Sequence, residues 1–287
     1  MLLGKTGSGK SSFIKLLRGK DDTGNEPDVD GGTNSTTVEV TPYNCHVNDR
    51  SVILIDTPGF DDDVRDNIDI LLAITSNLLR LALEGSQLHG VIFLHDISER
   101  RFSGSQKRTL SILRQMCGAG AMGNVIIGTT MWSSDKKKNE QEMREAHILK
   151  EHWDGIHSTV RLPEDDFDAA AGIVTALLSV PRVYLLVQDE MYKTGGELGK
   201  TTVGKMISAE GKDKLESLKQ QGKDKDAGTL ERVLEKLKRP ADMTFAEKFG
   251  LAIAAPIVLA PAALVAAPVG VIYALVHGAN YFTGGSK

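Results

Sequence analysis

Eight residues near the start of the chain constrain its fold more than any others. They read Gly4-Lys5-Thr6-Gly7-Ser8-Gly9-Lys10-Ser11, and they match the pattern G-x-x-x-x-G-K-[ST] at every fixed position. The glycines let the main chain curl until successive N–H groups point at phosphate oxygens. Lys10 adds a cation for the β- and γ-phosphates, and the Ser11 hydroxyl is a ligand for Mg²⁺. The stretch therefore predicts the phosphate-binding loop (P-loop) of a nucleoside triphosphatase.

The residues on either side of this loop fit a strand–loop–helix unit. Residues 12–18 carry apolar side chains at helical spacing and stop at Gly19, so we expect a helix whose N-terminus faces the phosphates. Only Met1, Leu2 and Leu3 precede the loop, whereas a strand of about five or six residues normally leads into it. We therefore expect the first strand to be truncated at the N-terminus.

A second signature follows the first by some forty positions. Residues 51–55 form a continuous apolar run that predicts a buried strand, and the run ends in Asp56-Thr57-Pro58-Gly59. In P-loop proteins an acid at such a strand tip faces the Mg²⁺, usually through a water, and the Gly59 N–H can reach the γ-phosphate. Asp56 and Gly59 therefore join the candidate site.

In the rest of the first 190 residues, segments with the apolar pattern of strands alternate with segments that have the apolar spacing of helices. Strands are expected at 38–43, 91–94, 124–130 and 183–187, and helices at 61–83, 107–117, 140–153 and 169–178, with a capping box at Ser103–Gln106. This alternation predicts an α/β fold: a P-loop NTPase with a doubly wound, mostly parallel sheet and flanking helices, plus a C-terminal helical extension. We assign residues 1–190 to this domain.

Composition narrows the class of protein. The chain has 287 residues, 41% hydrophobic and 25% charged, with a net charge of −4, so the overall balance does not indicate nucleic acid as a partner. Cys45 and Cys117 form neither a disulfide framework nor a metal-ligand spacing. We expect a reducing, cytoplasmic setting.

Two other patterns are interpreted as structural. Residues 199–205 read G-K-T-T-V-G-K and nearly repeat the P-loop, but Met206 occupies the hydroxyl position and no apolar strand precedes it, so we interpret them as a linker. His147, His152 and His157 are spaced five apart, which does not stack side chains on one helix face. That spacing favours a solvated helix over a metal site.

With these segments read, the chain resembles the immunity-associated, avirulence-induced-gene family of GTPases, relatives of septins and of the chloroplast import GTPases. The resemblance covers roughly residues 1–188 and is closest to the fungal branch, whose motifs are similar to residues 94–104, 113–118 and 129–132. It implies GTP binding with Mg²⁺, and often nucleotide-dependent dimerisation across the nucleotide face.

The resemblance also implies roles for individual residues. The first switch threonine, which senses the γ-phosphate through Mg²⁺, aligns best with Thr37, with Thr36 and Thr33 as alternatives. Lys10 and Thr37 are then the expected catalytic residues, and Ser11, Thr37 and Asp56 the expected Mg²⁺ contacts. The full nucleotide-binding set is Gly4, Lys5, Thr6, Gly7, Ser8, Gly9, Lys10, Ser11, Ser12, Asp56, Gly59, Thr130 and Trp132.

The chain departs from the common GTPase pattern where the base is recognised. Most GTPases carry N/T-K-x-D there, whose Asp accepts from N1–H and N2–H of guanine; here the segment is Thr129-Thr130-Met131-Trp132, without lysine or carboxylate. Trp132 can stack on a base, but stacking does not distinguish guanine from adenine. Asp135 is close enough to substitute if the loop bends. Base specificity therefore rests on the resemblance, and an ATP-using P-loop protein is the alternative.

A second departure concerns hydrolysis. Phe60 stands where many small GTPases place the glutamine that orients the attacking water. An apolar side chain cannot do this, so we expect slow intrinsic hydrolysis unless a partner or dimer mate supplies the missing group.

Two further segments complete the predicted organisation. Residues 191–248 form a charged helical linker, in which an apolar stripe predicts an amphipathic helix packed on the GTPase domain rather than a coiled coil; the stripe comprises Leu230, Val233, Leu234 and Leu237. Residues 249–287 are a hydrophobic tail rich in alanine and proline.

The tail raises the question of a membrane. Residues 249–286 carry no charged side chain, and the apolar run 251–276 is long enough to cross a hydrocarbon core of about 30 Å. Basic residues on its N-terminal side would leave the GTPase domain cytosolic. Pro256, Pro261 and Pro268 interrupt the run, so the alternatives are a membrane anchor and a buried hairpin or self-associating tail.

The sequence as a whole therefore predicts a GTP-binding switch protein with slow Mg²⁺-dependent hydrolysis, dimerising through its nucleotide face. The alternatives are the ATP-using protein and a membrane-associated scaffold whose assembly is regulated by nucleotide.

Overall fold

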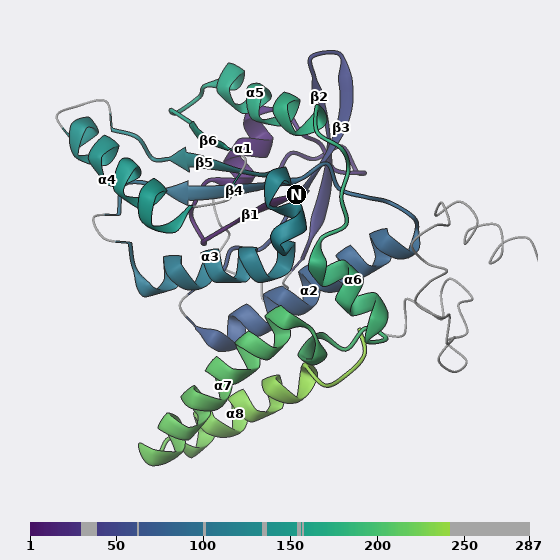
Figure 1. Cartoon of the computed structure of the whole chain (residues 1–287), viewed down its shortest axis with the longest axis vertical. Helices are drawn as coiled ribbons and strands as arrows, with labels where there is room; N and C mark the ends of the chain where they lie inside the picture. The colour runs from purple at the N-terminus through teal and green to yellow at the C-terminus, as the bar shows by residue number, and fades with distance from the viewer. Residues whose placement is uncertain are drawn as a thin grey trace, which may run out of the picture.

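A four-stranded parallel sheet lies at the centre of the computed structural model, which describes residues 1–29, 39–61, 63–99, 102–133, 137–153, 156 and 158–241 (Figure 1). The strand order is β1 (Leu2–Gly4), β4 (Val91–Asp96), β5 (Val125–Thr130) and β6 (Ser158–Arg161). Strands β4 and β5 are almost continuously apolar and buried, as expected for parallel strands covered on both faces. Strands β2 (Thr41–Val47) and β3 (Arg50–Asp56) form a separate antiparallel hairpin.

Helices cover both faces of the sheet, so the predicted doubly wound α/β fold is confirmed. One face is covered by α1 (Lys10–Leu16) and α5 (Phe167–Leu178), which share an apolar cluster with the β2–β3 hairpin. The other face carries α2 (Val64–Leu83), α3 (Gly104–Cys117) and α6 (Leu186–Lys193). Helix α4 (Lys137–His152) contributes Ile148 to the apolar cluster that α2, α3 and α6 share on this face. Two short 3₁₀ turns lie at Ala119–Asn124 and Leu198–Lys200.

The predicted helices form close to their expected bounds, and their caps explain the differences. Helix α3 begins at the predicted capping box: Gln106 N donates to Ser103 Oγ at 3.3 Å, and Ser103 N donates to Gln106 Oε1 at 2.8 Å. Helix α2 begins at Val64 rather than at residue 61, because the Asp63 carboxylate accepts from Arg65 N at 2.9 Å and caps the helix there.

The strand expected at 183–187 is wrong. Val183 makes an isolated bridge with Leu88, and helix α6 begins at Leu186. The buried Gln188 side chain fixes this helix start, since its Oε1 accepts from Leu185 N at 2.9 Å and its Nε2 donates to Leu78 O at 3.0 Å. A short apolar run does not by itself distinguish a strand from a buried helix.

Three other strands also differ from expectation. The strand at 51–55, expected to be buried, is β3, which is only partly buried and leaves Ile53 62% exposed. The strand that follows β5 in the sheet is β6, a short, partly exposed and polar edge strand that sequence reasoning missed. The strand expected at 38–43 is β2, which begins at Thr41 and continues to Val47.

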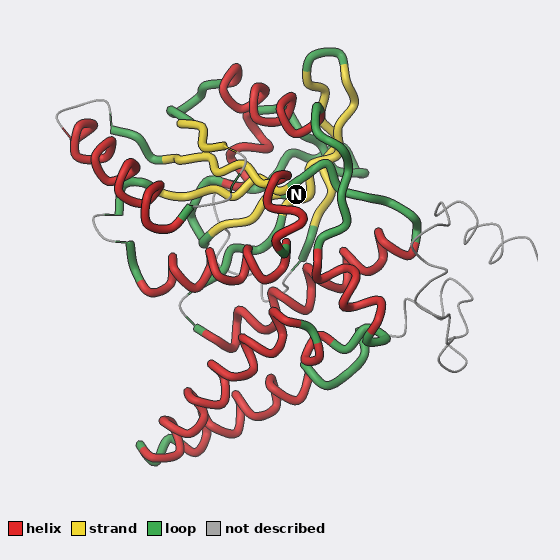
Figure 2. The backbone as a smooth tube through the Cα atoms, in the orientation of Figure 1, coloured by secondary structure: helices red, strands yellow, loops and turns green. Residues whose placement is uncertain are grey.

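The charged segment after α6 folds into two helices, α7 (Thr202–Gln220) and α8 (Asp224–Lys236), which extend below the sheet and its helices as a hairpin (Figure 2). Its predicted stripe is buried in the same apolar cluster as helices α2 and α3, and Lys236 Nζ lies 2.8 Å from Asp69 Oδ1 of α2. The expected single helix is thus a pair, packed on the domain as predicted.

The interpretation of residues 199–205 as a linker is wrong: they span the end of the 3₁₀ turn Leu198–Lys200 and the start of α7. The Thr201 hydroxyl accepts from Gly204 N at 3.0 Å and caps the helix, and a Cβ on Gly204 would lie 1.8 Å from Leu198 O. The second glycine of the pattern therefore allows a close backbone approach between the 3₁₀ turn and α7.

The hydrophobic tail at residues 249–287 lies outside the described residues. Within the residues that the structure describes, no helix combines the length and apolarity needed to cross a membrane.

Candidate nucleotide site

The predicted P-loop connects β1 to α1 and has the curled backbone that its glycines allow. Gly7 and Gly9 have φ angles of 78° and 90°, in the left-handed region. At the end of β1, a Cβ on Gly4 would lie 2.5 Å from Leu94 O. A larger residue at position 4 would therefore push the loop away from the neighbouring strand β4.

Lys10 is the first residue of α1 and is 7% exposed. Its Nζ donates to Lys5 O at 3.0 Å, across the mouth of the loop. Burial lowers the pKa of Lys10 to about 8, and the nearby Asp56 carboxylate opposes this shift only in part. The loop thus holds a poorly solvated cation near the Asp56 carboxylate.

Ser11 and Asp56, the predicted Mg²⁺ contacts, lie together. Ser11 Oγ donates to Asp56 Oδ2 at 2.9 Å, while the buried Asp56 Oδ1 has no hydrogen-bond partner among the described residues. Burial raises the pKa of Asp56, against the opposing effects of the Ser11 hydrogen bond and Lys10. An unpartnered carboxylate oxygen beside a hydroxyl fits the oxygen ligands that Mg²⁺ prefers. The third expected contact, Thr37, lies outside the described residues, as do Thr36 and Thr33.

The segment after Asp56 is attached to the P-loop by backbone hydrogen bonds. Phe60 N donates to Gly4 O at 3.1 Å, Thr6 N donates to Phe60 O at 3.0 Å, and the Thr6 hydroxyl donates to Gly59 O at 3.2 Å. A Cβ on Gly59 would lie 2.5 Å from the Thr6 backbone, so only glycine fits there. Gly59 therefore lies against the loop, and the contact of its N–H with the γ-phosphate stays a prediction.

The Phe60 side chain is 1% exposed and belongs to the core beneath the sheet. It anchors the segment and presents no polar group to a water. Its burial agrees with the expectation that position 60 cannot orient a nucleophile.

At the end of β5, Thr130 contacts the P-loop. Its hydroxyl donates to Ser8 O at 3.1 Å and lies 3.3 Å from His95 O, so Thr130 braces the loop from the neighbouring strands. Trp132 directs its indole N–H to Thr129 O at 2.9 Å. Asp135, the candidate substitute for the missing guanine-reading acid, lies outside the described residues.

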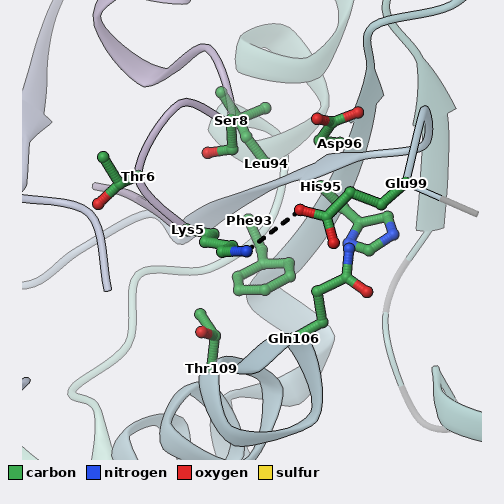
Figure 3. Close-up of a pocket in the computed structure, with 10 residues that line it drawn as sticks. All are labelled: Lys5, Thr6, Ser8, Phe93, Leu94, His95, Asp96, Glu99, Gln106 and Thr109. Atoms are coloured by element: carbon green, nitrogen blue, oxygen red, sulfur yellow. Dashed lines mark hydrogen bonds and ion pairs between the residues drawn. The ribbon is translucent and has the colours of Figure 1, made fainter. Parts of the chain in front are cut away.

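A small pocket lies on the β4 side of the loop (Figure 3). Lys5 Nζ reaches Glu99 Oε1 at 3.2 Å across it, and the buried Ser8 hydroxyl has no hydrogen-bond partner among the described residues. His95 lines the pocket, and burial lowers its pKa to about 4. Lys5 is one of the expected nucleotide contacts, and its side chain bridges the loop to the segment after β4. Glu99 was missed because a single acid in a charged segment carries no distinguishing pattern.

Known proteins match the same region of the chain. A family model described as 50S ribosome-binding GTPase matches residues 1–122. GTP-binding protein A of Dictyostelium discoideum is 28% identical over 136 residues, which are 47% of this chain and 28% of the length of that relative.

Solved structures of chloroplast translocon GTPases are also similar. The structure of Toc33 from Arabidopsis thaliana in complex with Mg²⁺ and GMPPNP aligns with 63% of this chain and over 84% of the Toc33 chain. The two sequences are 15% identical, and the TM-score is 0.46. A second structure concerns the chloroplast translocon components atToc33 and psToc159, for which dimerisation is described as important for GTPase activity. It aligns with 64% of this chain and over 84% of its own chain, at 15% identity and with a TM-score of 0.50.

The fold and the P-loop together define a P-loop NTPase fold, and the GTPase family model matches residues 1–122 of it. The finer resemblance to the immunity-associated family stays a prediction.

Proposed function

We propose that this protein is a GTP-binding switch that takes up GTP with Mg²⁺ and hydrolyses it slowly. The observation that carries the proposal is the pairing of Ser11 with Asp56, beside the buried Lys10; the second oxygen of Asp56 has no hydrogen-bond partner among the described residues. In this proposal the loop N–H groups and Lys10 bind the β- and γ-phosphates, Ser11 ligates the metal and Asp56 holds it through a water. When bound, Mg²⁺ supplies charge neutralisation between the phosphates.

Slow hydrolysis follows from Phe60. Its side chain is buried and its backbone N–H and C=O are both used by the P-loop, so residue 60 contributes nothing to positioning water. We propose that a second copy of the chain, docked on the nucleotide face, supplies the missing group. Dimerisation is described as important for GTPase activity in atToc33 and psToc159, which share this fold.

The first test is Lys10→Ala, with Lys15→Ala as its control. Lys15 lies on the exposed side of α1, one and a half turns from Lys10. Lys10→Ala is expected to abolish binding of a fluorescent GTP analogue in the presence of Mg²⁺, and Lys15→Ala to leave it unchanged. Unchanged affinity in a folded Lys10→Ala protein would contradict the proposal.

An ATP-using protein is the second candidate, because residues 129–133 offer no carboxylate to read guanine. Competition of GTP and ATP for the bound fluorescent analogue separates the two. Equal displacement would favour the second candidate.

Localisation is proposed from the sequence of the tail. We propose a cytoplasmic protein whose residues 249–287 attach it to a membrane, with nucleotide regulating assembly. Carbonate-washed membranes from cells expressing the chain with and without these residues provide the test. Equal recovery in the soluble fraction would exclude attachment through the tail.

A further inference from the structure

Four side chains form a closed ring at the carboxyl ends of β5 and β6. Trp132 Nε1 donates to Thr129 O at 2.9 Å and lies 3.2 Å from Thr129 Oγ1, and that hydroxyl donates to Glu145 Oε1 at 2.9 Å. Glu145 Oε2 in turn accepts from Arg161 Nε at 2.7 Å. The Arg161 guanidinium carbon lies 4.7 Å from the centre of the Trp132 ring and closes the circle.

The ring fixes the orientation of Arg161. Glu145 is 4% exposed, and burying an unpaired carboxylate costs desolvation free energy. The ion pair with Glu145 therefore holds the Arg161 side chain in place. Glu142 Oε1 accepts from Arg161 Nη1 at 2.7 Å. Arg161 Nη2 has no hydrogen-bond partner within the part of the chain that the structure describes, and the side chain is 45% exposed. A planar, pre-oriented donor group is therefore available at the surface.

The position of the ring places it beside the phosphate site. Ligands of doubly wound sheets bind outside the carboxyl ends of the strands. Thr130, the last residue of β5, contacts Ser8 of the P-loop, while its neighbour Thr129 pairs in register with Arg161, the last residue of β6. A nucleotide whose phosphates occupy the loop would extend its base toward these two strand ends.

We propose that Arg161 reads the base, through hydrogen bonds from its guanidinium to O6 and N7 of guanine. This inference rests on the proposed binding of GTP at the P-loop. Arginine donors match these two acceptors in a bidentate geometry, whereas adenine presents an amino donor where guanine has O6. A donor on β6 thus replaces the carboxylate that the chain lacks after β5, and it reads the opposite edge of guanine from the one that a carboxylate contacts.

Four nucleotides distinguish the two ways of reading guanine. Competition against a bound fluorescent GTP analogue is measured on the full chain with GTP, ATP, ITP and 7-deaza-GTP. If Arg161 reads O6 and N7, ITP binds like GTP because it lacks only the N2 amino group, while 7-deaza-GTP and ATP bind about tenfold more weakly. Weak ITP with unchanged 7-deaza-GTP indicates a carboxylate contacting N1–H and N2–H, and overturns the inference.

The remaining outcomes separate this inference from the proposed function. Equal affinity for all four nucleotides overturns base reading by Arg161 and leaves triphosphate binding intact. Failure of every nucleotide to bind overturns both.

The substitution Arg161→Lys provides a second test of the inference. Lysine keeps a positive charge for Glu145 but lacks the planar fork, so the preference for GTP over ATP is expected to fall about tenfold. The matched control is Arg182→Lys. The Arg182 guanidinium contacts His89, which lies just before the start of β4 and away from the carboxyl ends of the strands. The preference of this variant for GTP over ATP should therefore equal that of the unaltered chain. An unchanged preference in folded Arg161→Lys overturns the inference, and if this variant does not fold, the four-nucleotide comparison on the unaltered chain decides.

Discussion

At the scale of single residues, we expect the protonation of Lys10 to respond to a bound phosphate. Burial lowers its pKa to about 8, below the usual value of 10.5. Adjacent phosphates favour the charged ammonium and raise this pKa. Above pH 8 the complex therefore binds more protons than the free protein, so affinity must fall as pH rises.

We predict an approximately tenfold loss of affinity for GTP with Mg²⁺ between pH 7 and pH 9, the range in which free Lys10 becomes neutral. Titration of a fluorescent GTP analogue at several pH values measures it. In Lys10→Arg the guanidinium stays charged over this pH range, so the pH dependence of affinity due to Lys10 disappears. The affinity of this variant for GTP is expected to be weaker overall. Identical pH profiles for the two proteins would show that Lys10 does not titrate in this range.

At the residue scale, sequence reasoning identifies candidate residues where chemistry and spacing coincide in a short segment. Gly4 to Ser11 and Asp56 to Gly59 each define a backbone shape and a ligand, and the structure brings the two segments together. The contacts among Thr129, Glu145 and Arg161 were not predictable, because they join three elements up to 32 positions apart through ordinary polar residues. No periodicity marks such a set.

At the scale of elements, the failures of sequence reasoning have a common cause. Residues 183–187 are apolar enough for a strand, yet the Gln188 side chain caps a helix start inside them. Strand β6 is too short and too polar to show alternation, and it exists because β5 offers it a backbone edge. In both cases a tertiary contact decides the outcome rather than local propensity.

The start of α7 allows a direct test of packing at this scale. Gly204→Ala is expected to lower the free energy of unfolding by about 1–3 kcal/mol, because the new methyl group would overlap the Leu198 carbonyl. Gly228→Ala is the matched control: it lies in α8, where a Cβ would meet no described atom within 4 Å apart from the adjoining backbone of its own helix, and it should raise stability by roughly 0.5–1 kcal/mol. Urea unfolding followed by circular dichroism measures both. A neutral Gly204→Ala would mean that the 3₁₀ turn and α7 separate without cost.

At the scale of the whole molecule, the nucleotide site and the α7–α8 hairpin lie on different sides of the domain. The hairpin packs on α2 and α3, whereas the P-loop and Thr130 lie at the carboxyl ends of the strands (Figure 1). The described hairpin therefore leaves the proposed dimer face uncovered.

If a second copy completes the site there, turnover per molecule must depend on protein concentration. We expect the GTPase rate per chain to rise with concentration and to level off as the dimer saturates. Light scattering should then show a larger mass with a non-hydrolysable GTP analogue than with GDP. A rate per chain that is constant over the concentration range, with a monomer mass in both states, would exclude completion by a second copy.

The hydrogen bonds that join Gly4 and Thr6 to Phe60 form a short stretch of parallel-sheet pairing between the P-loop and the segment after Asp56. Because this backbone pairing belongs to the fold of the domain, we expect the ordering entropy of these residues to be lost when the chain folds and not when the ligand arrives. Association should then proceed without waiting for the loop to rearrange. Differences in affinity among nucleotides would appear mainly as differences in how long each remains bound.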